Sequence, residues 1–291
     1  AELPAVAGVT FATAETGVRY RRRPDLMLAL VDPGSTVAGV FTRSRTRSAP
    51  VDWCRASLSR GTARAIVVNA GNANAFTGKA GMRAVEATAM AAARAVGCAA
   101  DEVYVASTGV IGEVLDPHPI IAALPGMVAA ARGDAWADAA KAIITTDTFP
   151  KMATATARLG GRQARLCGFA KGSGMIAPDM ATMLGYVFTD AALAPEFLQQ
   201  LLSAANRETF SCITVDSDTS TSDTVLAFAT GKAGNSPLAS FDDPGADAFA
   251  AALTDVCRQL AHLVVRDGEG ARKFIEVRVA GAVSDESARK V

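Results

Sequence analysis

Short apolar runs alternate with alanine-rich stretches along most of this chain of 291 residues, and this alternation restricts its fold more than any other feature. Several runs contain almost no polar residue, as strands do when both faces of their sheet are covered. We expect strands at residues 26–31, 65–69, 103–106, 164–169, 184–188, 225–230 and 274–279. We expect helices at residues 79–96, 119–132, 134–143, 195–209 and 246–264. Half of the residues are hydrophobic, so the pattern predicts an α/β protein with a large core.

Two of the expected helices show further signals. The long helix after residue 78 has Thr77 as a candidate N-cap and Gly97 as a candidate C-terminal stop. In the last helix, apolar side chains recur at steps of three and four residues and form one stripe, namely Phe249, Leu253, Val256, Leu260 and Leu263. On the alternation alone, a doubly wound parallel sheet would be the default architecture.

The charges of the chain balance, with 29 Lys and Arg residues against 29 Asp and Glu residues. A balanced surface creates no general field that attracts nucleic acid or an acidic membrane, so we expect neither as a partner. The densest basic run, at residues 19–23, fits a solvated turn before Pro24 better than a phosphate contact. The first residues lack a basic-then-apolar signal pattern, and no run approaches ~18 apolar residues.

The metal-binding residue types do not form a recognisable site in the sequence. The five cysteines are scattered without a Cys-x-x-Cys pair, and His118 and His262 supply the only imidazoles, so we expect no zinc. The acidic residues Asp216, Asp218 and Asp223 lack the glycine and the distal glutamate of a calcium loop, which favours an ordinary turn. Free thiols suit a reducing compartment, so we expect a cytoplasmic protein.

The segment at residues 171–184, KGSGMIAPDMATML, places Thr182 between a loop with glycine and proline and an expected strand. A threonine hydroxyl inside a chain stays protonated at neutral pH and is a weak nucleophile. If the bond between Ala181 and Thr182 were cut, the new α-amino group, with an unperturbed pKa of about 7.7–8.0, would serve as its base. We therefore hypothesise that Thr182 is a nucleophile exposed by self-cleavage. The same residues also suit a plain turn before a strand.

These fourteen residues resemble the cleavage motif of the ornithine acetyltransferase family, also called glutamate N-acetyltransferases, of arginine biosynthesis. Five further segments resemble family motifs in the same order along the chain: an asparagine-rich turn at 69–75, an oxyanion segment at 107–112, a substrate-contacting segment at 145–148, a shared block at 214–221 and an acidic segment at 267–274. A match of this length and order is far more specific than a lone glycine pattern.

The resemblance implies a layered αββα sandwich, shared with other self-processing hydrolases and acyltransferases, instead of the doubly wound sheet. It implies an α fragment of residues 1–181 and a β fragment of residues 182–291, assembled as a heterotetramer with two copies of each. It also implies that Thr182 takes an acetyl group from N2-acetylornithine and passes it to glutamate, with ping-pong kinetics because the intermediate is covalent. No cofactor is implied, and the use of acetyl-CoA as a further acetyl donor stays open.

The resemblance assigns roles to six further residues. Thr108 and Gly109 match the oxyanion segment and follow an apolar run, so their backbone N–H groups would lie at a strand end; a plain turn that needs a glycine is the alternative. Lys171 and Glu269 would bind the carboxylate and an ammonium group of an amino-acid substrate. A hydroxyl contact would come from one member of a threonine pair, Thr145 or Thr146. Without the resemblance, the lysine and the glutamate would pass as solvated surface charges.

The match is incomplete at two places. Asp179 stands where the family more often has asparagine, and an added carboxylate there would alter the rate of maturation or the pKa of the α-amine, although simple variation is equally compatible. Family members also continue beyond residue 291 and draw substrate contacts from that tail. We expect that a form without the tail folds and cleaves itself but transfers acetyl groups poorly.

Two other functions remain compatible with the sequence. A self-processed aminopeptidase or amidase on the same scaffold would use water in place of glutamate as the acceptor. A catalytically idle relative would bind ligands or serve a structural role without ever cutting itself. The acidic clamp at Glu269 favours acetyl transfer over the aminopeptidase or amidase. The complete segment at residues 171–184 counts against the catalytically idle relative.

Overall fold

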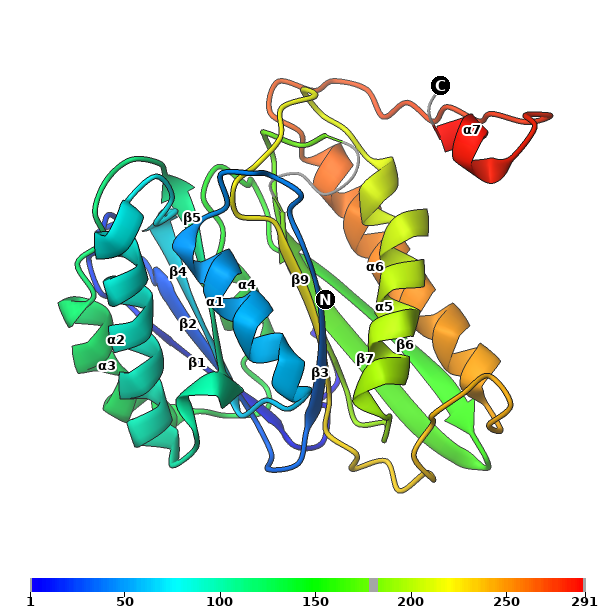
Figure 1. Ribbon diagram of the computed structural model, residues 1–291, viewed down its shortest axis with the longest axis horizontal. Coiled ribbons are helices and arrows are strands. Elements are labelled where there is room, and N and C mark those ends of the chain that lie inside the picture. Colours follow the sequence, from blue (N-terminus) through cyan, green and yellow to red (C-terminus); the bar gives the residue numbers. More distant parts are fainter. Residues whose placement is uncertain (1, 178–182, 290–291) are drawn as a thin grey trace.

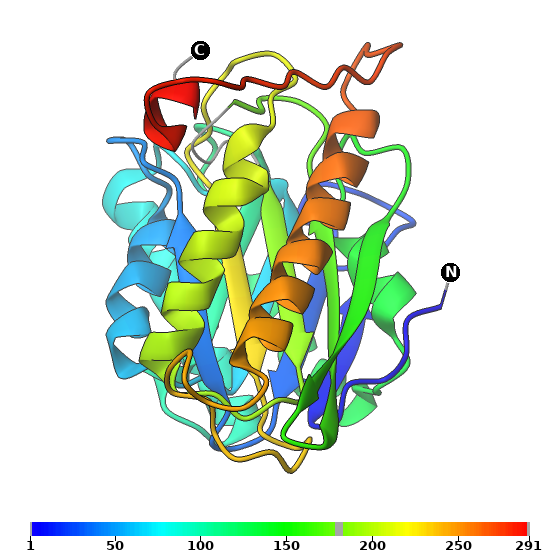
Figure 2. The same cartoon turned by 90° about the vertical axis from the view of Figure 1, so that its right-hand side faces the viewer.

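The computed structural model describes residues 2–177 and 183–289, and in this part of the chain two β-sheets pack face to face between two layers of helices (Figure 1, Figure 2). The expected αββα sandwich is therefore confirmed, and the doubly wound parallel sheet is excluded. Most buried strands are covered on both faces, which explains why so many of them read as nearly continuous apolar runs.

The first sheet has the strand order β1-β2-β4-β5 and carries two helices on its outer face (Figure 1). Strand β2 runs antiparallel to β1 and β4, whereas β4 and β5 are parallel. Leu26 and Leu28 of β2 pack toward the helices, while Met27 and Ala29 pack toward the other sheet. The elements of this half are Val9–Ala14 (β1), Leu26–Val31 (β2), Ala65–Asn72 (β4), Val103–Val110 (β5), Gly78–Val96 (α2) and His118–Ala130 (α3).

The second sheet has the order β3-β9-β8-β7-β6, and two long helices cover its outer face (Figure 2). Strands β8 and β9 are parallel, and the other neighbours are antiparallel. Val187 of β8 packs toward the helices and Phe188 toward the first sheet. The elements are Thr36–Phe41 (β3), Lys151–Leu159 (β6), Arg162–Lys171 (β7), Leu184–Thr189 (β8), Thr224–Ala229 (β9), Pro195–Glu208 (α5) and Ala246–Arg266 (α6).

Aromatic side chains fill the space between the two sheets. Phe11 of the first sheet meets Phe188 of the second edge to face, with ring centroids 5.2 Å apart, and Trp136 lies 4.5 Å from Phe11. Phe188 also stacks on Phe228 at 5.0 Å. Each of these rings is at most 1% exposed, so together they bury a large apolar area and fix the distance between the sheets.

Short helices complete the sandwich. Helix α1 (Ala49–Ser57) packs against β5 and β3, and α4 (Trp136–Ala142) against β1, β2, β6 and β7, so each helix covers one open side between the sheets. Helix α7 (Asp285–Arg289) follows an exposed extended segment. Single 3₁₀ turns occur at Leu58–Arg60, Ala100–Glu102 and Phe210–Cys212.

The five expected helices correspond to α2–α6, and six expected strands correspond to β2, β4, β5, β7, β8 and β9. Gly97 ends α2 in the left-handed conformation, with φ of 76°, as predicted. Thr77 occupies the N-cap position, but its hydroxyl donates to Asn74 Oδ1 (2.8 Å) instead of capping the helix.

The remaining differences have local causes. The prediction of a strand at 274–279 was wrong. These residues are extended but unpaired among the described residues, and Ile275 and Val277 are 73% and 80% exposed. Apolar and charged residues alternate there, yet a strand also needs a partner with free backbone groups. Strands β1, β3 and β6 were not predicted, because threonine, glycine and charged residues interrupt their apolar runs. The nine-residue helix α1 was not predicted either.

Helix α6 is, among the described residues, long and apolar enough to cross a membrane by length and composition alone. Its apolar stripe packs against β6 and β7, with Phe249 and Leu260 completely buried. A core helix of a folded domain has this distribution, so the length of α6 carries no further meaning.

We expect Phe188→Ala to lower the free energy of unfolding by about 3–5 kcal/mol, because it opens a cavity at the centre of the aromatic core. Urea denaturation of single chains that also carry Thr182→Ala would measure this. The control Val277→Ala, at an 80% exposed position, should change the free energy by less than about 0.5 kcal/mol. Equal effects of the two substitutions would contradict the assignment of this core.

Candidate active site

A small cavity lies at one end of the sandwich, where the C-terminal ends of β4, β5 and β7 meet the N-terminal ends of β8 and β9. Its described lining consists of Thr108, Lys171, Met183, Leu184, Ser220 and Ser222. The structure thus brings together a predicted oxyanion residue and a predicted substrate-binding lysine, which are 63 positions apart in the sequence. The predicted nucleophile Thr182 and the cleavage residue Ala181 lie outside the described residues, but Met183 follows Thr182 directly and lines the cavity.

The predicted oxyanion residues Thr108 and Gly109 lie at the end of β5. Gly109 has a φ of 131° and faces Gly71 of β4 in the strand register. A Cβ atom at Gly109 would lie 2.3 Å from the carbonyl carbon of Gly71, so no other residue fits without moving the strands. Thr108 is 5% exposed and lines the cavity, whereas Gly109 is exposed. The backbone conformation and the close approach to Gly71 therefore require glycine at position 109. The role of the N–H groups of Thr108 and Gly109 in catalysis stays a prediction.

The asparagine-rich turn supports this strand end from the side. Ser107 Oγ donates to Asn69 Oδ1 (2.6 Å), and Asn69 Nδ2 donates to the carbonyl of Asn72 (2.9 Å). Asn72 Oδ1 in turn accepts from the backbone N–H of Asn74 (2.8 Å). All four side chains are buried, so the asparagines satisfy backbone groups that a sharp turn would leave unpaired.

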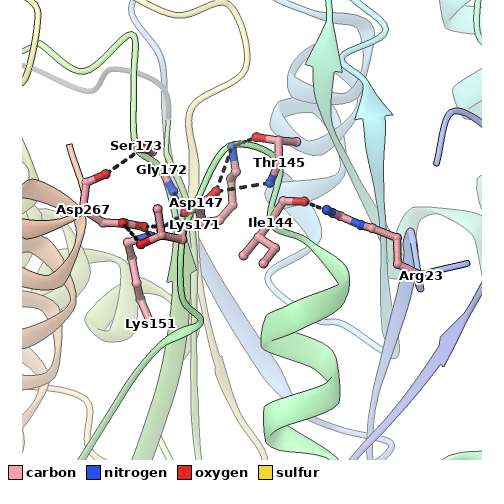
Figure 3. A network of polar contacts seen from close by, with 10 residues as sticks. Arg23, Ile144, Thr145, Asp147, Lys151, Lys171, Gly172, Ser173 and Asp267 are labelled. Atoms are coloured by element: carbon pink, nitrogen blue, oxygen red, sulfur yellow. Dashed lines mark hydrogen bonds and ion pairs between the residues drawn. The ribbon is translucent and has the colours of Figure 1, made fainter. Parts of the chain in front are cut away.

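Lys171 is 3% exposed and ends β7 at the cavity (Figure 3). Its Nζ donates to Thr145 Oγ1 (2.8 Å) and lies 3.8 Å from Asp147 Oδ2. Thr146 has an exposed side chain, so Thr145 is the member of the threonine pair that lies beside the lysine. Burial lowers the pKa of Lys171, and the negative charge of Asp147 opposes this.

A second buried lysine lies behind Lys171. Lys151 is fully buried, and its Nζ donates to Asp147 Oδ1 and to Asp267 Oδ2, both at 2.6 Å (Figure 3). Burial by itself would raise the pKa of Asp147, but the charges of Lys171 and Lys151 outweigh it and the pKa is lowered. The pKa of Asp267 is lowered as well, because hydrogen bonds from Lys151 and Thr148 outweigh its desolvation. The sequence reading had assigned no role to these charges.

The predicted acidic clamp, Glu269, lies on the loop that follows α6. Its backbone N–H donates to the carbonyl of Ser173 (2.7 Å), and Ser173 Oγ donates to the carbonyl of Asp267 (2.6 Å). A Cβ atom at Gly174 would lie 2.6 Å from Glu269 Oε2, so this glycine leaves room for the carboxylate. The side chain is exposed, and its charge is close enough to favour the charged form of Lys171. Glu269 therefore lies beside the segment that leads to the predicted cleavage site.

Asp216 holds the same segment from the other side. Its Oδ1 accepts from the backbone N–H of Ile176 (2.9 Å), and Oδ2 accepts from the N–H of Met175 (2.5 Å). Met175 adopts a φ of 56°, which is unusual for a residue with a side chain. The described residues contain no cluster of His, Cys, Asp or Glu side chains able to hold a metal ion, and Asp216 is an anchor of the loop.

Asp223 is a buried acid that the sequence suggested only as part of an incomplete calcium loop. It precedes β9, is completely buried, and accepts a hydrogen bond from the backbone N–H of Met183 at Oδ1 (2.9 Å). Its other oxygen is buried without a hydrogen-bond partner among the described residues. Burial raises the pKa of Asp223 to about 7. Asp223 thus contacts Met183, the residue that follows the predicted nucleophile, and this contact is visible only in the folded structure.

Residues on both sides of the predicted cleavage site build the same sheet. Strand β8 pairs with β7, and β9 pairs with β3, so the second sheet interleaves strands from the segments 1–181 and 182–291. Thr148 and Lys151 from the first segment also bind the carboxylate of Asp267 from the second. These contacts would hold the two segments together after a cut.

Comparison with known proteins supports one family. A sequence model described as the ArgJ family matches residues 10–291. The chain is 56% identical over 294 residues to the arginine biosynthesis bifunctional protein ArgJ of Rhizobium meliloti, and 54% identical over 293 residues to that of Bradyrhizobium diazoefficiens. Each alignment covers 100% of this chain and 71% of the relative.

Solved structures agree. An ornithine acetyltransferase from Mycobacterium tuberculosis, solved in complex with ornithine, is 35% identical with a TM-score of 0.54, and the match covers 61% of this chain and 95% of that one. An ArgJ protein from Bacillus halodurans is 31% identical with a TM-score of 0.55, covering 62% and 97%. An aminopeptidase and amidase from Ochrobactrum anthropi, a variant of the Ntn hydrolase fold, is 13% identical with a TM-score of 0.51 and shares the fold alone.

We expect Asp223→Asn to change how stability depends on pH. In the folded state Asp223 holds its proton up to about pH 7, whereas an unfolded aspartate releases it near pH 4, so deprotonation opposes folding as the pH rises between these values. The variant lacks this contribution and should gain stability relative to the wild type at pH 8 compared with pH 4. Urea unfolding at both values, in chains that carry Thr182→Ala, would measure it; parallel pH dependences would refute the raised pKa.

Proposed function

The chain belongs to the ArgJ family, and we propose that it transfers an acetyl group from N2-acetylornithine to glutamate through an acetyl-threonine intermediate on Thr182. Family membership makes it an acyltransferase of arginine biosynthesis that acts on small molecules. The observation that carries the finer proposal is the cavity where Lys171, Thr108 and Met183 meet. Acyl transfer from an amino acid requires a cation for the substrate carboxylate and backbone donors for the oxyanion, and the cavity offers both beside Met183, the residue that follows the proposed nucleophile.

Maturation comes first in this proposal. The Thr182 hydroxyl attacks the carbonyl carbon of Ala181, and the peptide C–N bond breaks and frees the α-amine of Thr182. Water then hydrolyses the resulting ester, which releases the carboxylate of Ala181 and restores the Thr182 hydroxyl. Two observations favour it. The solved ornithine acetyltransferase and ArgJ chains match 61% and 62% of this chain over nearly their whole length, and residues 1–181 make up 62% of it (181/291). The segment before the cut is also anchored by Asp216 and Ser173.

Turnover then uses the new terminus. The Thr182 hydroxyl attacks the acetyl carbonyl, its proton passes through the α-amine to the departing nitrogen of ornithine, and the acetyl group stays as an ester. The amine of glutamate attacks this ester and restores the hydroxyl. Backbone N–H groups of Thr108 and Gly109 would stabilise the oxyanion, where one donor is typically worth about 2.7–4 kcal/mol. Because ornithine leaves before glutamate attacks, the kinetics are ping-pong.

Three side chains would bind the substrates. Lys171 would bind the substrate carboxylate, with Thr145 adding a hydroxyl contact, because the two are already hydrogen-bonded at 2.8 Å. Glu269, exposed at the rim, would bind the side-chain ammonium of ornithine. The carboxylate of Glu269 and the ammonium of Lys171 thus match the ammonium and the carboxylate of N2-acetylornithine.

The assembly and the setting are also proposals. The covalent ester conserves the acetyl group, so the transfer needs no cofactor, and a second reaction with acetyl-CoA as donor would account for a bifunctional enzyme. We infer a heterotetramer of two α and two β fragments from the family resemblance; the strand pairings of the second sheet support only the association of one α with one β segment. Five free cysteines favour a cytoplasmic location.

Hydrolysis of a peptide or amide is the second candidate function, and only the shared fold favours it.

We expect Thr182→Ala to abolish both cleavage and acetyl transfer. Denatured intact mass of freshly purified protein should show two fragments, 1–181 and 182–291, in the wild type and one chain in the variant. Transfer of labelled acetyl from N2-acetylornithine to glutamate should be detectable in the wild type alone. Residual transfer in the variant would remove Thr182 as the nucleophile, and release of acetate without acetylglutamate would favour the hydrolase.

We expect Lys171→Ala to raise KM for N2-acetylornithine at least tenfold while self-cleavage continues, because a charge-assisted contact worth about 1.5–3 kcal/mol is lost. Steady-state kinetics with the cleaved protein would measure it. The control is Lys232→Ala, which removes a surface lysine that pairs with Asp32 at the opposite end of the sandwich and should leave KM unchanged. An unchanged KM in Lys171→Ala would exclude this lysine from the site.

A further inference from the structure

The carboxylate of Asp147 lies at the centre of the polar network behind the candidate site (Figure 3). Its Oδ1 accepts from Lys151 Nζ (2.6 Å) and from the backbone N–H of Gly172 (2.7 Å). Its Oδ2 accepts from the backbone N–H of Thr145 (3.2 Å) and lies 3.8 Å from Lys171 Nζ. The side chain is completely buried, so these contacts are shielded from water and their electrostatic interactions are stronger than they would be in solvent.

This arrangement joins two segments that carry the proposed substrate contacts. By accepting from Gly172, Asp147 fixes the residue that directly follows Lys171, and by accepting from Thr145 it fixes the backbone of the second contact residue. The side chains of Lys171 and Thr145 are then close enough to hydrogen-bond each other at 2.8 Å. One carboxylate therefore sets the relative position of both groups.

The two buried lysines around Asp147 are held differently. Lys151 makes two charge-assisted hydrogen bonds at 2.6 Å, to Asp147 and Asp267, which is typical of a structural ion pair. Among the described residues, Lys171 has a hydrogen bond to Thr145 alone, and the nearest carboxylate oxygen is 3.8 Å away. An ammonium group has three donors, so two N–H groups of Lys171 have no acceptor within the described part of the chain and are available for a ligand, while the Asp147 carboxylate still stabilises the charge.

The charge state of Lys171 depends on its neighbours because burial disfavours an ammonium ion. Asp147 is the largest opposing influence, Asp223 and Glu269 also favour the charged form, and Lys151 disfavours it. Loss of the Asp147 charge would leave Lys171 beside Lys151 with only the weaker support of the other two acids. Lys171 would then lose its proton at a lower pH.

We propose that Asp147 is a positioning residue, which keeps Lys171 charged and aligned with Thr145 so that the pair receives the carboxylate of an amino-acid substrate. This inference rests on the proposed function for the identity of the ligand, but the effect on Lys171 itself does not. The alternative is that Asp147 serves only to neutralise Lys151. Asp267 provides a matched control, because it binds Lys151 at the same distance and has no ion pair or hydrogen bond to Lys171 among the described contacts.

The test compares Asp147→Asn with Asp267→Asn in the full chain. The first readout is the titration midpoint of Lys171 Nζ, followed by NMR in chains that carry Thr182→Ala and assigned by the loss of its signal in Lys171→Met. Asp147→Asn should lower the midpoint by about one to three pH units, whereas Asp267→Asn should leave it within about half a unit of the wild type. No shift in Asp147→Asn, or an equal shift in both variants, overturns the proposal.

The second readout is kinetic and uses the cleaved proteins. Asp147→Asn should raise KM for N2-acetylornithine at least tenfold with a smaller change in kcat, and the alkaline limb of kcat/KM should move to lower pH with the NMR midpoint. If Asp147→Asn does not fold, Asp147→Glu keeps the charge with a longer side chain, and should raise KM while the midpoint stays near the wild type. An unchanged KM in Asp147→Glu, or a KM raised equally in Asp267→Asn, contradicts a positioning role.

The two readouts separate the two ideas. If the wild type transfers no acetyl group while the NMR midpoint shifts in Asp147→Asn alone, the proposed function fails and the control of Lys171 by Asp147 stands. If the wild type transfers acetyl groups and the midpoint does not move, the proposed function stands and the role of Asp147 falls.

Discussion

Face-to-face packing of the two sheets is the constraint on which the rest of this structure depends. Phe11 and Trp136 from one side and Phe188 from the other meet within 6 Å, and this dry aromatic layer sets the separation of the sheets. Thr108 near the end of β5 and Lys171 at the end of β7 line the same cavity, so the packing brings the ends of a strand from each sheet together. The cavity that holds Thr108 and Lys171 is a consequence of this packing, since neither sheet alone would form it.

Burial also explains the electrostatics of the site. An isolated charge costs several kcal/mol when it leaves water, and it is tolerated only with partners close by. The chain places Lys151 between two aspartates at 2.6 Å, and this compensated pair provides a rigid base for the less tightly held Lys171. Asp223 is the exception, because one of its oxygens has no hydrogen-bond partner among the described residues and burial raises its pKa to about 7. Such uncompensated groups are concentrated at functional sites.

The same contacts give a physical reason why a cut chain would stay assembled. Strand β8 lies between β7 and β9, so backbone hydrogen bonds of the second sheet connect residues on both sides of residues 181 and 182. Asp267 adds a buried ion pair with Lys151 across the same boundary. Separation of the two segments would expose the apolar faces of β7 and β8 and remove Asp267 from Lys151. The segments 1–181 and 182–291 therefore contribute to one domain, because their strands share a sheet.

The sequence by itself determined helices α2–α6, six strands and the segments that carry the site, because periodicity, glycine and proline act over a few residues. It wrongly predicted a strand at 274–279, since a strand also needs a distant pairing partner that a local pattern does not show. Thr145 and Thr146 are equivalent as neighbours in sequence, and only the packing of β7 beside them places one against Lys171. The burial of Asp147 and Asp223 was likewise decided by tertiary structure. A carboxylate becomes a functional group through its surroundings, and those come from residues far away in the sequence, such as Lys151, which lies 116 positions from Asp267.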